Sequence, residues 1–286
     1  MARIAGIVLA LAALAAAPAA AEAAGSADVA ALQVALRSAG LYVGTVDGVD
    51  GPGTRGAVRA FQSRHGLVPD GVAGARTRLA LGRRGGPQLG SRVLRSGATG
   101  WDVAALQFRL AWHGFPSATF DGGFGSHTDA ALRRFQSWAG IPPDGVAGAA
   151  TVRALQAPIP RSPIWLIRPL GAAAIGDRFG PRGNGFHPGI DYPAPVGTPV
   201  TAAGRGRVVF AGWDPGGYGN LVVIEHPAGV RSMYAHLSRI EASVGQWTSA
   251  GTEIGRVGAT GFATGPHLHF ELRLRGAAID PLTALR

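Results

Sequence analysis

The strongest constraint on the fold is an internal repeat in the first half of the chain. Four short sequences recur at one fixed offset of 74 positions. They are DVAALQ at 28–33 and 102–107, PDGVAGA at 69–75 and 143–149, Asp-Gly at 47–48 and 121–122, and Phe-Gln at 61–62 and 135–136. A single offset maintained without gaps predicts a tandem duplication of one small module.

Each copy is predicted to fold as three short helices separated by tight Asp-Gly turns. An aspartate is expected to cap the first helix, a glycine to end it, and a threonine to start the second helix. The residues assigned in this way are Asp28 and Asp102 (first cap), Gly40 and Gly114 (end of the first helix), Thr54 and Thr128 (start of the second), Val58, Phe61, Leu132 and Phe135 (its inner face), and Leu81 and Leu155 (end of the third).

The order D-V-x-x-L-Q, D-G, A-V-x-x-F-Q and P-D-G-V-x-G resembles the peptidoglycan-binding module, a small three-helix bundle. The resemblance covers residues 26–82 and 98–156. It implies that bacterial peptidoglycan is a partner. Most of the matching residues are core and turn residues, which specify a fold and not a ligand, so the sequence assigns no wall-contacting positions.

Two segments are interpreted as linkers. Residues 83–97 follow the first repeat, and their Gly- and Arg-rich composition is typical of a flexible, basic linker. Residues 157–165 contain three prolines, which favours a stiffer spacer.

The N-terminus is interpreted as a signal peptide at residues 1–21. Arg3 is a positive start, residues 4–16 are apolar, and small residues follow at a cleavage site. The apolar run is too short for a permanent membrane helix. We therefore expect export to the periplasm or the extracellular space, association with the cell wall, and no permanent membrane anchor. The chain has no cysteine, which excludes disulfides and thiolate chemistry.

From residue 166 onward the apolar pattern changes from a helical period to alternation, which predicts an antiparallel β domain over 166–286. The strand candidates are 198–203, 206–213, 220–226, 230–237, 253–258 and 267–274, with a hairpin turn at 227–229. The predicted fold class is thus multidomain α + β: two three-helix modules followed by an antiparallel β-sheet domain.

The β domain contains five of the eight histidines and one well-placed aspartate. Strand alternation in HLHFELRL places Leu268 and Phe270 in the core and His267 and His269 together on the opposite face. The same rule places Tyr234 and His236 on one face. Imidazole and carboxylate are the ligands that zinc takes when thiolate is absent, and three of them leave a position open for water. We therefore predict a metal site, with His226 interpreted as a turn residue.

The motifs HPGIDY, GTPV, GYGN, YAHL and GPHLHFE resemble those of the lysostaphin-type zinc metalloendopeptidases, which cut peptidoglycan cross-links. The resemblance covers 166–286. It implies one zinc ion per chain held by His187, Asp191 and His269, with His236 and His267 as the catalytic pair. Which histidine is the general base, and which peptide bond is cut, stay open.

Two further residues are candidates near this site. Tyr234 is a candidate contact to the reaction intermediate, and Arg178 is a candidate residue of the substrate groove.

Charge and residue pattern leave several other classes to weigh. The net charge of +10 comes from arginine alone and would suit anionic wall polymers or nucleic acid, but no basic stripe with interleaved aromatics supports nucleic acid. Two histidines and a carboxylate also occur in non-haem iron oxygenases.

A non-catalytic wall-binding protein that activates a partner hydrolase is the main alternative. It predicts a missing ligand, and no ligand is missing. Neither G-x-S-x-G nor H-E-x-x-H occurs.

Overall fold

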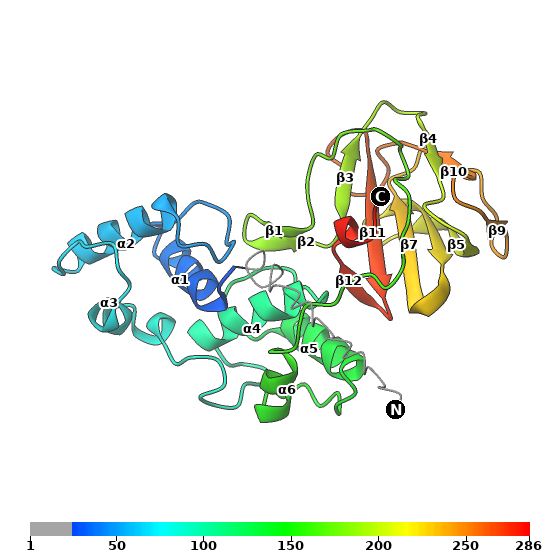
Figure 1. Ribbon diagram of the computed structural model, residues 1–286. Coiled ribbons are helices and arrows are strands. Elements are labelled where there is room, and N and C mark those ends of the chain that lie inside the picture. The colour runs from blue at the N-terminus through cyan, green and yellow to red at the C-terminus, as the bar shows by residue number, and fades with distance from the viewer. Residues whose placement is uncertain (1–24) are drawn as a thin grey trace, which may run out of the picture.

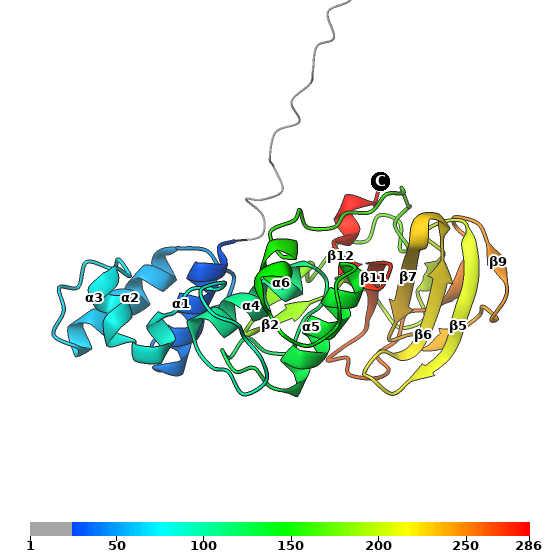
Figure 2. The same cartoon turned by 90° about the horizontal axis from the view of Figure 1, so that it is seen from below.

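The computed structural model describes residues 25–286, so the predicted signal peptide lies outside the described part. Two helical units and a β domain follow one another in a row, as Figures 1 and 2 show from two directions. Between residues 25 and 286, no helix is both long and apolar enough to cross a bilayer.

Each repeat forms the three predicted helices. They are α1 Ala27–Ser38, α2 Pro52–Arg64 and α3 Ala75–Ala80 in the first repeat, and α4 Trp101–Trp112, α5 Ser126–Trp138 and α6 Ala149–Ala154 in the second. A 3-10 turn, η1 Gly82–Gly85, follows α3. Gly40 and Gly114 have φ values of 71° and 91°, which confirms the left-handed ends predicted for α1 and α4.

The predicted aspartate caps and threonine starts are wrong. Ser26 caps α1, accepting a hydrogen bond from the Val29 amide. The Asp28 carboxylate instead accepts from the Trp101 indole at 2.9 Å. Asp102 is fully buried and pairs with Arg92 at 2.6 Å. Both aspartates bond to side chains outside their own helix, a use that the helix sequence does not encode.

The helix starts differ by two residues because the threonines serve another purpose. Each of four glutamines is buried and uses its amide to hold an Asp-Gly turn and the threonine of the next helix. The four sets are Gln33, Asp47, Gly48 and Thr54; Gln62, Asp70, Gly71 and Thr77; Gln107, Asp121, Gly122 and Thr128; and Gln136, Asp144, Gly145 and Thr151. The repeated Gln and Asp-Gly motifs therefore stabilise turns inside the fold.

The two repeats share a hydrophobic core. Helices α1 and α4 lie side by side (Figure 1), and buried residues of both, such as Leu36 and Phe108, belong to one cluster. The segment predicted as a flexible linker is also packed: Leu94 is fully buried and bridges to Ala147 of the second repeat. Burial of its apolar residues, which composition did not reveal, holds this segment on the second repeat.

The β domain contains the six predicted strands and six others. The strands are β1 Gly180–Arg182, β2 Gly185–His187, β3 Ile190–Pro193, β4 Pro199–Thr201, β5 Gly206–Asp214, β6 Gly219–Glu225, β7 Val230–Ala235, β8 Arg239–Ile240, β9 Trp247–Thr248, β10 Glu253–Arg256, β11 His267–Leu274 and β12 Ala277–Ile279, with 3-10 turns η2 Pro227–Gly229 and η3 Pro281–Thr283.

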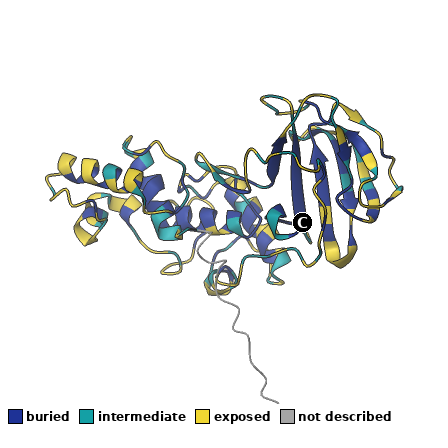
Figure 3. Ribbon diagram, turned by 45° about the horizontal axis from the view of Figure 1, so that its top comes forward, coloured by how far each residue is buried: buried dark blue, intermediate teal, exposed yellow. Residues whose placement is uncertain are grey.

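Strand β11 pairs with three other strands, β3, β7 and β12. In the largest sheet the order is β12-β11-β7-β6-β5-β9. One edge of β11 is shared by two strands: β3 pairs with its first half and β12 with its second half. A second sheet has the order β4-β10-β8, and β1 and β2 form a separate hairpin. Figure 3 shows the buried strands of the main sheet. Leu268, Phe270 and Leu272 are all 0% exposed, which confirms the predicted core face of β11.

Candidate metal centre

The three predicted ligands meet where β2, β3 and β11 come together. The Nε2 atom of His187 lies 3.2 Å from Oδ1 of Asp191 and 3.1 Å from Nδ1 of His269. The His269 Nδ1 to Asp191 Oδ1 distance is 2.7 Å. Asp191 and His269 are directly paired across the β3–β11 ladder, so sheet register sets their separation.

These atoms fit a zinc ion. Zinc bonds of about 2.0–2.1 Å in tetrahedral geometry place ligand atoms about 3.3 Å apart. The three observed separations, from 2.7 to 3.2 Å, are close to that value. Two imidazole nitrogens and one carboxylate oxygen also make up a donor set that zinc accepts, and they leave a fourth position open.

The hydrogen bonds of the imidazole rings fix which nitrogen faces the centre. Nδ1 of His187 lies 3.0 Å from the carbonyl oxygen of Arg178, so this nitrogen donates and Nε2 is left for a metal. Nε2 of His269 lies 3.1 Å from Oε1 of Glu271, which leaves Nδ1. Carbonyl and carboxylate partners of this kind orient metal-binding histidines.

The two predicted catalytic histidines lie beside the three ligands. The His236 and His267 rings are 4.8 Å apart between centroids, and Nε2 of His267 lies 3.7 Å from Oδ1 of Asp191. Nδ1 of His236 lies 2.8 Å from the carbonyl oxygen of Thr260, and Nδ1 of His267 lies 2.8 Å from that of Gly265. Both rings therefore have an unprotonated Nε2 when they are neutral.

His236 reaches the site by leaving its strand. It follows the end of β7 with φ of 61°, a left-handed conformation that is uncommon for residues other than glycine. The preceding residues alternate regularly, with Tyr234 toward the core and Ala235 paired with His269. Continued alternation would turn the His236 side chain toward the core, and the positive φ turns it to the metal centre instead.

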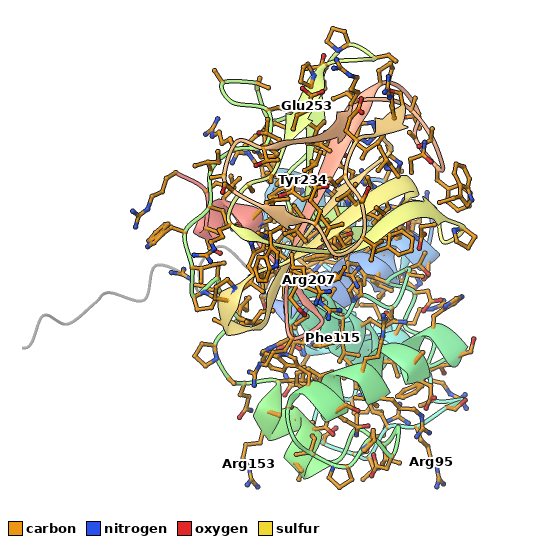
Figure 4. All side chains as sticks on the ribbon, turned by 90° about the vertical axis from the view of Figure 1, so that its right-hand side faces the viewer. Arg95, Phe115, Arg153, Arg207, Tyr234 and Glu253 are labelled. Carbon is orange, nitrogen blue, oxygen red and sulfur yellow. The ribbon has the colours of Figure 1, made fainter. Side chains whose placement is uncertain are left out.

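Tyr234 is therefore a core residue, and the predicted contact to a reaction intermediate is wrong. Its side chain is 0% exposed, and its hydroxyl accepts from the Ala203 amide at 2.7 Å. Figure 4 shows Tyr234 among the strands of the β domain. His226 belongs to the same buried chain of hydrogen bonds, through Ser232, as expected of a structural residue. Arg178 contacts the site through its carbonyl, while its side chain is exposed.

Glu271 is the functional residue that sequence reasoning did not assign. It is 0% exposed, and besides His269 it binds the Tyr218 hydroxyl at 2.6 Å and the Arg273 guanidinium at 2.9 Å. The available signal was alternation along β11, which places Glu271 and Arg273 on the face of His269. Tyr218 comes from the GYGN motif, in the turn before β6.

The carboxylates and imidazoles of the centre shift one another's pKa values. Burial alone would raise the pKa of Asp191, but hydrogen bonds from His187 and His269 hold it well below its usual range. Burial alone would lower the pKa of His269, yet its bonds to Asp191 and Glu271 raise it to about 9. Burial lowers the pKa of His236 from its ordinary value. The metal-free centre thus holds a proton on His269 and leaves His236 neutral at pH 7.

Gly189 allows the ligands to approach. A Cβ atom at this position would lie 2.5 Å from the carbonyl oxygen of Phe270 and 2.9 Å from Cε1 of His269. Only glycine lets the chain pass this close to β11 without displacing the His269 ring.

A cavity of about 440 Å³ lies between the two repeats, formed by α1, η1 and the start of α4. Small residues, among them Ala31, Ala35 and Gly100, leave the space, and the exposed Arg83 and Arg84 contribute positive charge to its lining. The cavity exists only because the two repeats dock together.

The three parts of the chain match two families. Residues 25–81 and 99–155 match a family described as putative peptidoglycan binding domain, and residues 185–281 match peptidase family M23. The catalytic domain of lysostaphin from Staphylococcus simulans is 37% identical, with 38% of this chain covering 90% of that one at a TM-score of 0.37. The His-Asp-His group and the match to family M23 together define a metallopeptidase domain. Residues 185–281 thus form a peptidase family M23 domain.

Two curated relatives match the same domain. The DD-carboxypeptidase/endopeptidase Mpg of Neisseria meningitidis is 45% identical over 123 residues, which is 41% of this chain and 28% of the relative. The peptidoglycan DD-endopeptidase ShyB of Vibrio cholerae is 41% identical over 98 residues, 34% of this chain and 23% of the relative. The chain therefore spans less than a third of these relatives.

Proposed function

We propose that this protein is an exported, wall-associated peptidoglycan hydrolase that cleaves stem or cross-link peptides with one zinc ion per chain. The observation that carries the proposal is the convergence of five side chains from β2, β3, β11 and the residue after β7. Three of them, His187, Asp191 and His269, have ligand atoms within 4.8 Å of one another. The other two, His236 and His267, each have an Nε2 free of protein hydrogen bonds beside that group.

Held by His187, Asp191 and His269, a zinc ion would supply Lewis-acid chemistry, which lowers the pKa of water to about 7 and polarises a carbonyl group. The chain supplies the proton transfers. His236 is the general base, because burial keeps its ring neutral and its Nδ1–H bond to Thr260 leaves Nε2 as the acceptor. The proton that Nε2 of His236 takes from the attacking water then passes to the departing amine nitrogen.

His267 stabilises the transition state. Its ring is more exposed than that of His236, and its Nε2 is 3.7 Å from a carboxylate oxygen of Asp191, so a proton on Nε2 would lie beside the metal position. In that form it donates Nε2–H to the developing oxyanion, while the bond from Nδ1 to Gly265 keeps the ring in place.

The repeats tether the enzyme to its substrate. We assign the wall contact to the cavity between them, where Arg83 and Arg84 can pair with carboxylates of the wall peptides. The relative named as a peptidoglycan DD-endopeptidase supports the same substrate for the β domain.

The decisive experiment is mass spectrometry of fragments released from purified walls by the zinc-loaded protein. We expect new free amino and carboxyl ends in stem or bridge peptides and no new reducing sugar ends. His236→Ala should abolish these products, and His127→Ala, which changes an exposed histidine of α5, should not.

New reducing sugar ends would refute the peptidase assignment. Tight wall binding without any cleavage products, in a protein shown to contain zinc, would instead favour a non-catalytic wall protein that activates a partner hydrolase.

A further inference from the structure

The metal ligand His187 lies on an element that cannot be stable by itself. Strands β1 and β2 form a separate two-stranded sheet with three paired positions, and Gly180 faces His187 in that ladder. An isolated hairpin of this size is at best marginally stable in water. The hairpin therefore needs support from outside to hold His187 in place.

The helical repeats provide this support. The Val46 amide of the first repeat donates to the Gly183 carbonyl at 2.8 Å, and the Phe120 amide of the second donates to the Asn184 carbonyl at 2.6 Å. Both acceptors lie in the turn of the hairpin. Each repeat thus anchors the turn that joins β1 to β2.

An aromatic cluster holds the base of the same hairpin. Trp112, the last residue of α4, packs its indole edge-on against Phe179 and Phe186, with centroids 6.1 Å and 5.4 Å away. Phe179 and Phe186 are 4.9 Å apart. Trp112 contacts both the core of the repeats and the core of the β domain.

These two phenylalanines adjoin the groups that orient the metal ligand. Phe186 directly precedes His187. Phe179 directly follows Arg178, whose carbonyl accepts the hydrogen bond from Nδ1 of His187. By fixing both rings, Trp112 fixes the donor and the acceptor of this bond relative to one another.

We propose that Trp112 is a positioning residue for the metal centre, acting through Phe179 and Phe186 on His187. The helical repeats then have a second role beside wall binding, because they complete the metal site of the β domain. This inference rests on the proposed metal site but not on the substrate or on catalysis.

The test is the zinc affinity of the full-length chain, measured by competition with a chromogenic chelator. Loss of a group that orients a metal ligand typically weakens metal affinity by about 10–100-fold. Trp112 does not bond to the ligand itself but acts through Phe179 and Phe186. We therefore expect Trp112→Ala to weaken zinc affinity by about tenfold, the low end of that range. Trp112→Phe should stay close to the wild type, since a ring remains between Phe179 and Phe186. The indole Nε1 has no hydrogen-bond partner to lose.

Trp138 offers a matched control. Its indole donates to the Leu274 carbonyl at 3.2 Å, so it joins the second repeat to the β domain away from the hairpin. Trp138→Ala should lower the stability of the interface and leave zinc affinity unchanged. If Trp112→Ala fails to fold, Trp112→Leu keeps apolar volume without the ring edges and should still weaken zinc binding.

Three results have distinct meanings. Wild-type zinc affinity in folded Trp112→Ala or Trp112→Leu would overturn the positioning role. Equal weakening by Trp138→Ala would also overturn it, by showing that general loosening of the interface is responsible. A wild-type protein that takes up no zinc would refute the metal site itself.

Discussion

The imidazole of His269 donates a hydrogen bond from Nε2 to Oε1 of Glu271, 3.1 Å away on the same face of β11. Glu271 is fully buried and also binds Tyr218 and Arg273, so its charge is held in one place. This carboxylate orients the ring whose Nδ1 faces the metal position, and it makes that nitrogen a better donor to a metal.

Glu271→Gln should therefore weaken zinc affinity by about tenfold or more, because the amide accepts the same bond without the negative charge. It should also lower the free energy of unfolding. Breaking a buried ion pair costs about 3–5 kcal/mol, and we expect a decrease at the low end of this range. The loss is at the low end because the Arg273 side chain remains 32% exposed. Metal competition and chemical denaturation measure the two effects. Adding Arg273→Met should recover stability but not affinity, and recovery of both would contradict the orienting role.

Zinc uptake should release a proton at pH 7. In the metal-free protein Asp191 and Glu271 hold the pKa of His269 at about 9, so its Nδ1 is protonated and must lose that proton to bind a metal. Affinity should consequently fall about tenfold for each pH unit below 9 from this group alone. Calorimetry in two buffers of different ionisation enthalpy counts the protons, and a count of zero at pH 7 would contradict the coupling.

The β domain should lose stability in mild acid because of His226. Its side chain is buried, and burial lowers its pKa below the value of about 6.5 for an unfolded histidine. The unfolded chain then binds the proton first, so the stability is present above pH 6.5 and is lost as the pH falls below it. Hydrogen exchange of β6 and β7 amides at pH 7 and pH 5 measures the loss. His226→Gln should show a smaller difference, and an equal difference would exclude His226 as the cause.

Phe262 is expected to contact substrate. It is 83% exposed on the loop whose Thr260 and Gly265 carbonyls orient the predicted catalytic histidines, His236 and His267. Loss of about 1 kcal/mol of aromatic contact corresponds to about a fivefold higher KM for Phe262→Ala, with kcat little changed. Steady-state kinetics on a soluble wall peptide would show this. Trp247→Ala removes a 68% exposed aromatic from β9, at the opposite edge of the main sheet from β12, and should change neither KM nor kcat.

Wall retention should depend on where the arginines lie. Arg83→Glu with Arg84→Glu places negative charge in the cavity between the repeats and should reduce binding to purified walls by about tenfold, the effect of about 1.4 kcal/mol. Arg95→Glu with Arg153→Glu changes the net charge equally at the exposed positions marked in Figure 4 and should reduce it much less. Equal losses in a sedimentation assay would show that overall charge, and not the cavity, attracts the protein to the wall.

Much of the fold was predictable because its signals are local. The offset of 74 identified the duplicated helices, and alternation identified β11 almost residue by residue. The caps were mispredicted because each aspartate bonds to a side chain outside its own helix: Asp28 to Trp101, and Asp102 to Arg92. Local pattern contains no information on such partners.

The sequence by itself determined the residue types and strand faces of the metal centre, since His267, His269 and Glu271 alternate with core residues along one strand. Only the tertiary structure decided that His236 turns into the centre while Tyr234 stays in the core, because a single left-handed residue reverses the alternation. It alone decided that the repeats hold the hairpin of His187, since that contact depends on how separately folded units pack.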